Sequence, residues 1–222
     1  MNSDMIIRAV ILTKSFMHGG FCVAGIDLNH KKWVRFVADT SGSPLMNQNL
    51  MCDDRSICEP LDVVDAEVIQ YSPVKHHTEN VVVSSALFHK LGRTSIESVT
   101  KNFYPSDNHN YIFGNTLSYI TQEEMTAKNI NYSLMLVLVS NLNITYEIQN
   151  TGKVRAVADF CYNNRGYRFI RITDPYVVFA DRNYIMQNQI VSIPKAYIVM
   201  SLAREPYELN GKYYKFAAKI FA

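Results

Sequence analysis

The sequence predicts a mainly β protein with minor helix, in which two β-barrel units are joined by a partly helical connector. The 222 residues include 14 tyrosines and 11 phenylalanines, and aromatic residues favour strands. The apolar share of 48% against a charged share of 19% indicates a folded chain with a sizeable core. Several segments alternate apolar and polar residues, which is the pattern of a strand with one buried face.

The first barrel unit is expected over residues 1–72. Short apolar or alternating runs are separated there by turn residues, and Pro73 closes the last run, as expected for a meander of strands. A loop rich in Gly, Pro, Asn and Asp occupies residues 39–60. The strands of this unit are expected at residues 6–13, 20–28, 33–38 and 61–71.

A connector is expected over residues 73–130 and a second barrel unit over residues 131–222. Within the connector, Thr121 followed by Glu124 has the spacing of a capping box and predicts a short helix. In the last strand, alternation places Tyr213 and Lys215 on the solvent face and their neighbours on the core face. The other strands of this unit are expected at 132–148, 153–160, 167–173 and 195–203.

The stretch ILTKSFMHGGFCVAGI, residues 11–26, allows three interpretations: a phosphate-binding loop, a Cys-His catalytic site, or a turn between strands. No helix follows the glycines, so no helix N-terminus is available to an anion. Cys22 lies inside an apolar strand pattern, which favours a core thiol over an activated nucleophile. The turn is therefore the favoured interpretation, and Lys14 and His18 are kept as candidate ligand contacts.

The sequence indicates no catalytic motif, no metal site and no cofactor. The four cysteines form no CxxC pair and are expected to be free thiols. The histidines of the connector have no cysteine or carboxylate at ligand spacing. The N-terminal run lacks the features of a signal peptide, and no apolar stretch is long enough to span a bilayer. A cytoplasmic protein with no membrane partner and no enzymatic activity is therefore expected, although the missing motif does not exclude an enzyme.

Positive charge is concentrated in residues 151–171, which contain five basic residues and the single acid Asp159. Single-stranded nucleic-acid binders combine such a basic surface with aromatic rings on which bases stack. A solvated strand face is the alternative interpretation of the same residues. The candidate nucleic-acid contacts are Lys14, His18, Trp33, Arg35, Lys153, Arg155, Tyr167, Arg168, Arg171, Tyr213 and Lys215.

Three segments carry a resemblance to a known family: the stretch at 11–26 followed by KWVRFV, the segment ADFCYNNRGYRFIRITDP, and the terminal YYKFAAKI. Together they resemble the prokaryotic dual OB domain proteins, which are built from two OB-like barrels. Phe16 and Met17 depart from the family pattern, which often has basic residues after Lys14-Ser15. The matching positions are Lys14, Ser15, Gly19, Gly20, Cys22, Gly25, Trp33, Arg35, Tyr167, Asp174, Pro175, Tyr214 and Lys215.

The resemblance implies two OB-like barrels and a nucleic-acid role in a bacterial defence or mobile-element context. OB folds bind varied ligands, so the fold alone does not decide between them. The expected function is a non-enzymatic binding module for single-stranded DNA or RNA. A protein-interaction or adaptor module, which would have a protein partner, and a small-nucleotide sensor are the alternatives.

Overall fold

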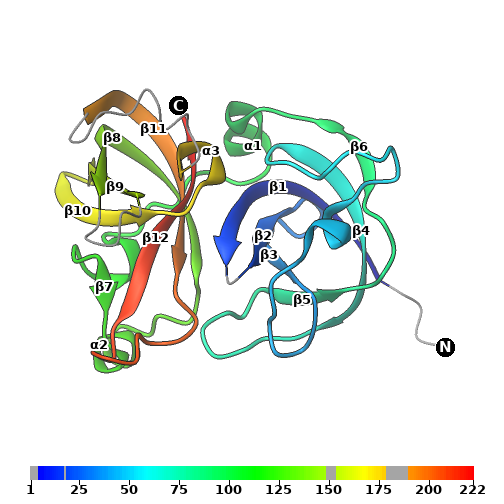
Figure 1. The fold of residues 1–222 in the computed structure, drawn as a ribbon, viewed down its shortest axis with the longest axis horizontal. Coiled ribbons are helices and arrows are strands. Elements are labelled where there is room, and N and C mark those ends of the chain that lie inside the picture. The colour runs from blue at the N-terminus through cyan, green and yellow to red at the C-terminus, as the bar shows by residue number, and fades with distance from the viewer. Residues whose placement is uncertain (1–4, 18, 149–153, 179–189) are drawn as a thin grey trace. The chain divides into compact units, whose positions relative to one another are not determined.

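The computed structural model describes residues 5–17, 19–148, 154–178 and 190–222 (Figure 1). The chain divides into two compact units, residues 1–105 and 106–222. Each unit is a closed five-stranded β-barrel with one additional short strand. The predicted mainly β fold with minor helix and two barrels is therefore confirmed.

In the first unit, the strands pair in the closed ring β1-β2-β3-β5-β4-β1. All pairs are antiparallel except β3 with β5, which is parallel and closes the barrel. The additional strand β6 pairs with β4, beside the first residues of β4 that β5 leaves open. The strands are β1 (Met5–Met17), β2 (Gly20–Asp27), β3 (Lys32–Val37), β4 (Asp62–Tyr71), β5 (Asn80–Val83) and β6 (His89–Arg93).

The fifth strand of the first barrel lies beyond the boundary expected at residue 72. Strand β5 begins at Asn80, and β6 and helix α1 (Ile96–Asn102) follow it within the first unit. The run Asn80–Val83 is only four residues long and is buried throughout. Periodicity cannot distinguish so short an apolar run from other buried segments, so the sequence assigned it to the connector.

The second unit repeats the same path. Its strands pair in the ring β8-β9-β10-β12-β11-β8, in which only β10 and β12 are parallel. The additional strand β7 pairs with the start of β12. The elements of this unit are β7 (Tyr119–Ile120), α2 (Gln122–Ala127), β8 (Leu134–Ile148), β9 (Val154–Tyr162), β10 (Arg165–Ile172), α3 (Pro175–Val178), β11 (Ile190–Leu202) and β12 (Tyr213–Phe221). A 3-10 turn at Asn47–Leu50 belongs to the first unit, and another at Ile112–Gly114 belongs to the second.

Each barrel encloses its own apolar core. Phe36, Phe88 and Val64 lie in the core of the first unit, and Tyr167, Phe160 and a broad set of aliphatic residues lie in the core of the second. The capping box predicted at Thr121 is present, because the Thr121 side chain accepts a hydrogen bond from the Glu124 amide and the Glu124 side chain accepts one from the Thr121 amide.

Two glycines of the 11–26 stretch explain its local structure. Gly19 has a φ of 85°, a left-handed conformation that glycine adopts at no steric cost. A Cβ at Gly25 would lie 2.0 Å from the carbonyl oxygen of Val10, so β1 and β2 can approach only because this residue lacks a side chain. The stretch is therefore the β1-β2 hairpin that the turn interpretation predicts.

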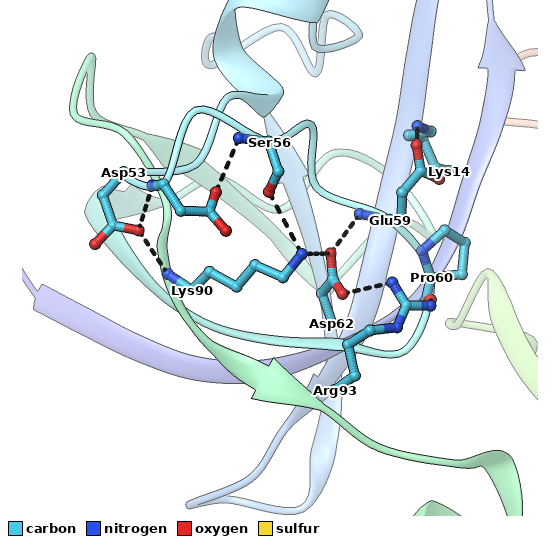
Figure 2. Close-up of polar contacts among 9 residues, drawn as sticks. Lys14, Asp53, Ser56, Glu59, Pro60, Asp62, Lys90 and Arg93 are labelled. Carbon is cyan, nitrogen blue, oxygen red and sulfur yellow. Dashed lines mark hydrogen bonds and ion pairs between the residues drawn. The ribbon is translucent and has the colours of Figure 1, made fainter.

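A buried carboxylate joins β4, β6 and the loop before β4 (Figure 2). Asp62 is fully buried and accepts hydrogen bonds from Arg93 at 2.8 Å and from the Glu59 amide at 2.9 Å. Lys90 forms an ion pair with it at 3.1 Å. A buried charge is stable only when it is paired and hydrogen-bonded, and Asp62 meets both conditions.

Candidate nucleic-acid interface

A β-bulge shapes the outer wall of the second barrel where β9 pairs with β10. Between Tyr167 and Ile170 of β10, the two residues Arg168 and Phe169 lie opposite the single residue Asp159 of β9. A bulge of this kind bends the strand and changes the direction of its side chains. Tyr167 and Ile170 point into the core, while Arg168 and Phe169 are both exposed.

Phe169 is held in an unfavourable backbone conformation that presents its ring to solvent. Its φ is 57°, the left-handed region, which costs a residue with a Cβ roughly 1–2 kcal/mol. The residue is 61% exposed, so burial of the ring compensates only a part of this cost. The backbone amide of Phe169 donates to Oδ1 of Asp159 at 2.8 Å, and this hydrogen bond fixes the conformation.

Three arginines lie on the same wall as Phe169. Arg168 and Arg171 are exposed, and Arg155 of β9 is half-buried. Arg155 lies two residues from Val157, the residue that pairs with Arg171 across the two strands, so the two side chains are diagonal neighbours. Desolvation lowers the pKa of Arg171, and the positive charge of Arg155 lowers it further.

In the part of the chain that the structure describes, no ion pair neutralises the positive charge of this wall. Within the described residues, Arg155, Arg168 and Arg171 make no salt bridge. The carboxylate of Asp159 accepts a hydrogen bond from the amide of Phe169 and forms no ion pair with a described residue. We call this surface, formed by Arg155, Arg168, Phe169 and Arg171, the β9-β10 wall.

Aromatic and basic side chains continue on both sides of the β9-β10 wall. At the β9-β10 turn, the guanidinium of Arg165 lies 4.6 Å from the ring centroid of Tyr111. Across β12, Phe216 is the strand partner of Arg171. Near the start of β12, Tyr214 contacts the rings of two further tyrosines and Lys212 lies over one of these rings. These contacts are Tyr214 with Tyr119 at 6.1 Å, Tyr214 with Tyr207 at 6.2 Å, and Lys212 Nζ over Tyr119 at 3.9 Å.

Three predicted contacts of the second barrel are inside it. Tyr167 is fully buried, stacks on Phe160 with the centroids 5.4 Å apart, and accepts a hydrogen bond from the Ile112 amide. Tyr213 is 5% exposed and donates to Gln122 at 2.9 Å. These two rings are therefore unavailable to a base in this structure, and the faces expected from alternation in both strands need correction.

Lys215, the third, is buried in a cradle of oxygen atoms. Its Nζ donates to the carbonyl oxygens of Ile112 and Asn115 and to the Asn115 side-chain oxygen, each at 2.7 Å. Burial lowers the pKa of Lys215 to about 7. The three acceptors use all the donors of an ammonium group, so Lys215 anchors the 112–115 segment to β12 and does not face solvent.

In the first barrel, the predicted contacts are largely occupied by partners within the unit. Lys14 pairs with Glu59 (Figure 2). Arg35 is buried, and it donates to Glu79 at 3.0 Å and to the Cys22 sulfur at 2.7 Å. A phosphate could reach Arg35 only by displacing these partners, so the expected exposed position of Arg35 beside Trp33 needs correction.

Trp33 is half-buried and packs edge-on against Tyr104, with the ring centroids 5.8 Å apart. Nearly every residue of β2 and of the last four positions of β3 is buried. The remaining two candidates, His18 and Lys153, lie outside the described residues. The structure therefore brings together only Arg155, Arg168 and Arg171 among the predicted contacts.

A comparison of the sequence with models of protein families assigns the chain to a family. The model of the dual OB-containing domain matches residues 7–220. The chain belongs to the dual OB-containing domain family. No curated protein and no solved structure matches the sequence. The two rings of five strands, each closed by one parallel pair, are the two OB barrels of this domain.

As a dual OB-containing domain, the chain is an OB-type binding module. The β9-β10 wall lies on the second and third strands of its second barrel. In OB folds this face, with the neighbouring loops, receives oligonucleotides and oligosaccharides. An exposed ring can stack on a planar group, and the arginines on the same wall can neutralise an anion. All four cysteines are free thiols.

Two further findings concern the described part of the dual OB-containing domain. No group of three or more His, Cys, Asp and Glu residues is placed there to hold a metal ion. No helix among the described residues is long and apolar enough to cross a membrane.

Phe169 is the main functional candidate that the sequence analysis missed. Strict alternation over YRFIRIT places Tyr167, Phe169 and Arg171 on one face, and the bulge separates Tyr167 from the other two. A signal was present in the spacing of the core residues, because Tyr167, Ile170 and Ile172 are three and then two positions apart. A break from a period of two in a strand indicates a bulge.

Proposed function

We propose that the second OB barrel binds single-stranded nucleic acid across the β9-β10 wall. The observation that carries this proposal is the exposed ring of Phe169, which has a φ of 57° and shares the wall with three arginines that make no salt bridge to any described residue. Strained backbone conformations persist where the surroundings enforce them, and they are concentrated at functional sites. The energetic cost at Phe169 has no evident structural return, since most of the ring is exposed.

The chemistry of the wall suits a strand of nucleotides. Base stacking on an aromatic side chain contributes roughly 1–3 kcal/mol per base and is independent of sequence. Arginines neutralise the phosphates, and this makes the affinity depend strongly on salt. The arrangement of one exposed ring with Arg155, Arg168 and Arg171 therefore supports binding to unpaired bases and their backbone, and both DNA and RNA offer these groups.

The proposal concerns the second barrel because the matching strands of the first barrel offer no such surface. In β2 and β3, the exposed fraction is small at nearly every position, and Arg35 is paired with Glu79. Of the arginines expected to neutralise phosphates, Arg155, Arg168 and Arg171 of the second barrel therefore remain in the proposal and Arg35 does not. The stacking residue is Phe169, in place of Tyr167 and Tyr213.

The test is a titration of the full chain into labelled single-stranded oligonucleotides, followed by fluorescence anisotropy at several salt concentrations. We expect the logarithm of the association constant to fall linearly with the logarithm of the salt concentration. We expect F169A to weaken binding roughly 5- to 150-fold, the equivalent of one lost stacking contact. The matched control is Y71A, because Tyr71 is an exposed ring (46%) next to a lysine, Lys32, on the first barrel.

Two results would count against the proposal. If F169A and Y71A have the same affinity as the unmodified chain, the ring of Phe169 does not contact the strand. If no oligonucleotide binds at low salt, the second barrel serves another ligand, and a protein partner or a small nucleotide becomes the leading hypothesis. A thermal-shift screen with nucleotides then separates these two, because a ligand that binds only the folded state raises Tm.

A further inference from the structure

One polar atom of the β9-β10 wall lacks a partner. The Nε atom of Arg155 is buried and has no hydrogen-bond acceptor within the structure. More than nine in ten buried polar groups in proteins are hydrogen-bonded, and each exception requires an explanation. The Arg155 side chain therefore has no hydrogen bond among the described residues that holds its guanidinium inside the protein, and the guanidinium can turn toward an acceptor at the surface.

The neighbours of Arg155 define what kind of acceptor fits. Arg171 is its diagonal neighbour across the β9-β10 pair, at roughly 7–8 Å between the backbones, and the two positive charges are close enough for one to lower the pKa of the other. On the other side, Glu147 of β8 is the strand partner of Arg155, yet no ion pair joins them among the described interactions. Among the described residues, no carboxylate forms an ion pair with either of these two neighbouring arginines.

A phosphate is the anion that this geometry favours. Guanidinium groups bind phosphate through parallel N–H···O hydrogen bonds, which gives direction as well as strength. Two arginines on adjacent strands can approach one phosphate from two sides, and Phe169, two residues before Arg171 in β10, lies next to it. A nucleotide has the same arrangement, with a planar base beside each phosphate.

We propose that Arg155 and Arg171 form a discrete subsite for one phosphate of the bound strand, adjacent to the base that stacks on Phe169. This inference rests on the proposed function and deepens it. It replaces a diffuse attraction between a basic surface and a polyanion with a defined position for one phosphate. The shared ligand chemistry is a phosphate group, which is either an internal linkage or a terminal phosphate of the strand.

The experiment uses the full chain and a set of oligothymidines of roughly ten nucleotides, the size range of one OB fold. Each oligonucleotide carries one neutral methylphosphonate linkage at a different position, and a separate pair carries a phosphate at the 5′ or the 3′ end. Binding is measured for the unmodified chain, for R155M and R171M, and for R168M as the matched control. Methionine keeps the aliphatic packing of the arginine stem, and thermal melting verifies that each variant is folded.

We expect one neutral linkage, or the loss of one terminal phosphate, to weaken binding by the unmodified chain roughly tenfold or more, as the loss of charged hydrogen bonds does. The position effect should disappear in R155M and R171M and persist in R168M. Each of the three variants should also reduce the slope of log affinity against log salt by roughly 1, because each removes one positive charge from the β9-β10 wall. R155K is expected to restore the salt slope but not the position effect, because lysine lacks the planar fork.

The outcomes separate the subsite from the function on which it rests. If every neutral linkage weakens binding equally, or if R168M removes the position effect as completely as R155M, the discrete subsite is wrong and the proposed function stands. If no unmodified oligonucleotide binds at all, the proposed function is wrong and the subsite falls with it.

Discussion

The backbone strain at Phe169 can be measured with a pair of variants that differ by one methyl group. F169A and F169G both remove the ring and the same apolar contacts, so comparing them cancels the loss of packing. What remains is the Cβ of alanine at a φ of 57°. A Cβ in the left-handed region costs roughly 1–2 kcal/mol, whereas glycine loses about 0.4–1 kcal/mol more conformational entropy on folding than alanine does.

The difference between these two effects predicts the result. F169G should have a free energy of unfolding about 1 kcal/mol higher than F169A, which corresponds to a Tm higher by roughly 4 °C for a unit of this size. At an ordinary strand position the order is reversed, because glycine destabilises a strand relative to alanine. The sign of the difference is therefore diagnostic, and its measurement needs only urea denaturation and calorimetry of the two variants.

The same pair separates stability from binding. Both variants should lose oligonucleotide affinity equally, because neither has a ring. The reasoning about strain is refuted if F169A is as stable as F169G or more stable. The reasoning about stacking is refuted separately if either variant binds as tightly as the unmodified chain.

Three other outcomes follow from the contacts described above. D159A should lower the free energy of unfolding by about 0.5–1.5 kcal/mol, because it removes the exposed hydrogen bond to the Phe169 amide, and it should weaken binding. Unchanged affinity would show that the bulge holds its shape without this hydrogen bond. D62L should destabilise the first barrel by roughly 1–3 kcal/mol in urea denaturation, because the Glu59 amide and two partly exposed cations lose their acceptor. R8M, which breaks an exposed pair, should move the urea midpoint little. Equal effects of the two variants would contradict this ranking. Lys215 has a pKa of about 7 in the folded state against 10.5 ordinarily, so between pH 7 and 10.5 the unfolded chain binds more protons than the folded chain. The free energy of unfolding should therefore rise with pH in this range, by up to about 1.4 kcal/mol per pH unit. The same dependence of stability on pH in K215M would show that Lys215 does not titrate.

The sequence was sufficient for the architecture because its strands form either alternating runs, as in β4, or apolar runs bounded by turn residues, as in β2. In β9, the alternation through 153–160 placed Arg155 on the outer face, where it lies. The boundary of the first barrel could not be found in this way, because β5 is a buried run of four residues whose place depends on its parallel pairing with β3. Such pairing joins distant parts of the chain and leaves no local pattern.

The faces of β10 and β12 were misassigned for a common physical reason. Each strand contains a bulge, after Tyr167 in β10 and at Ala218 in β12, where Val199 pairs with Lys219 and Met200 already pairs with Ala217. An extra residue reverses the assignment of every position beyond it. The burial of Lys215 depends in addition on the 112–115 segment, a contact distant in sequence that periodicity cannot indicate.

The short additional strands have a consequence for association between copies of the chain. In the first barrel, β5 covers only part of one edge of β4, and β6 pairs with another part of it. In the second barrel, β10 covers only part of one edge of β12, and β7 pairs with another part of it. The outermost strands are thus five and two residues long, and β6 carries His89, Lys90 and Arg93. Short, charged edges are poor templates for the addition of further strands, so both sheets present little backbone from which an intermolecular sheet could grow.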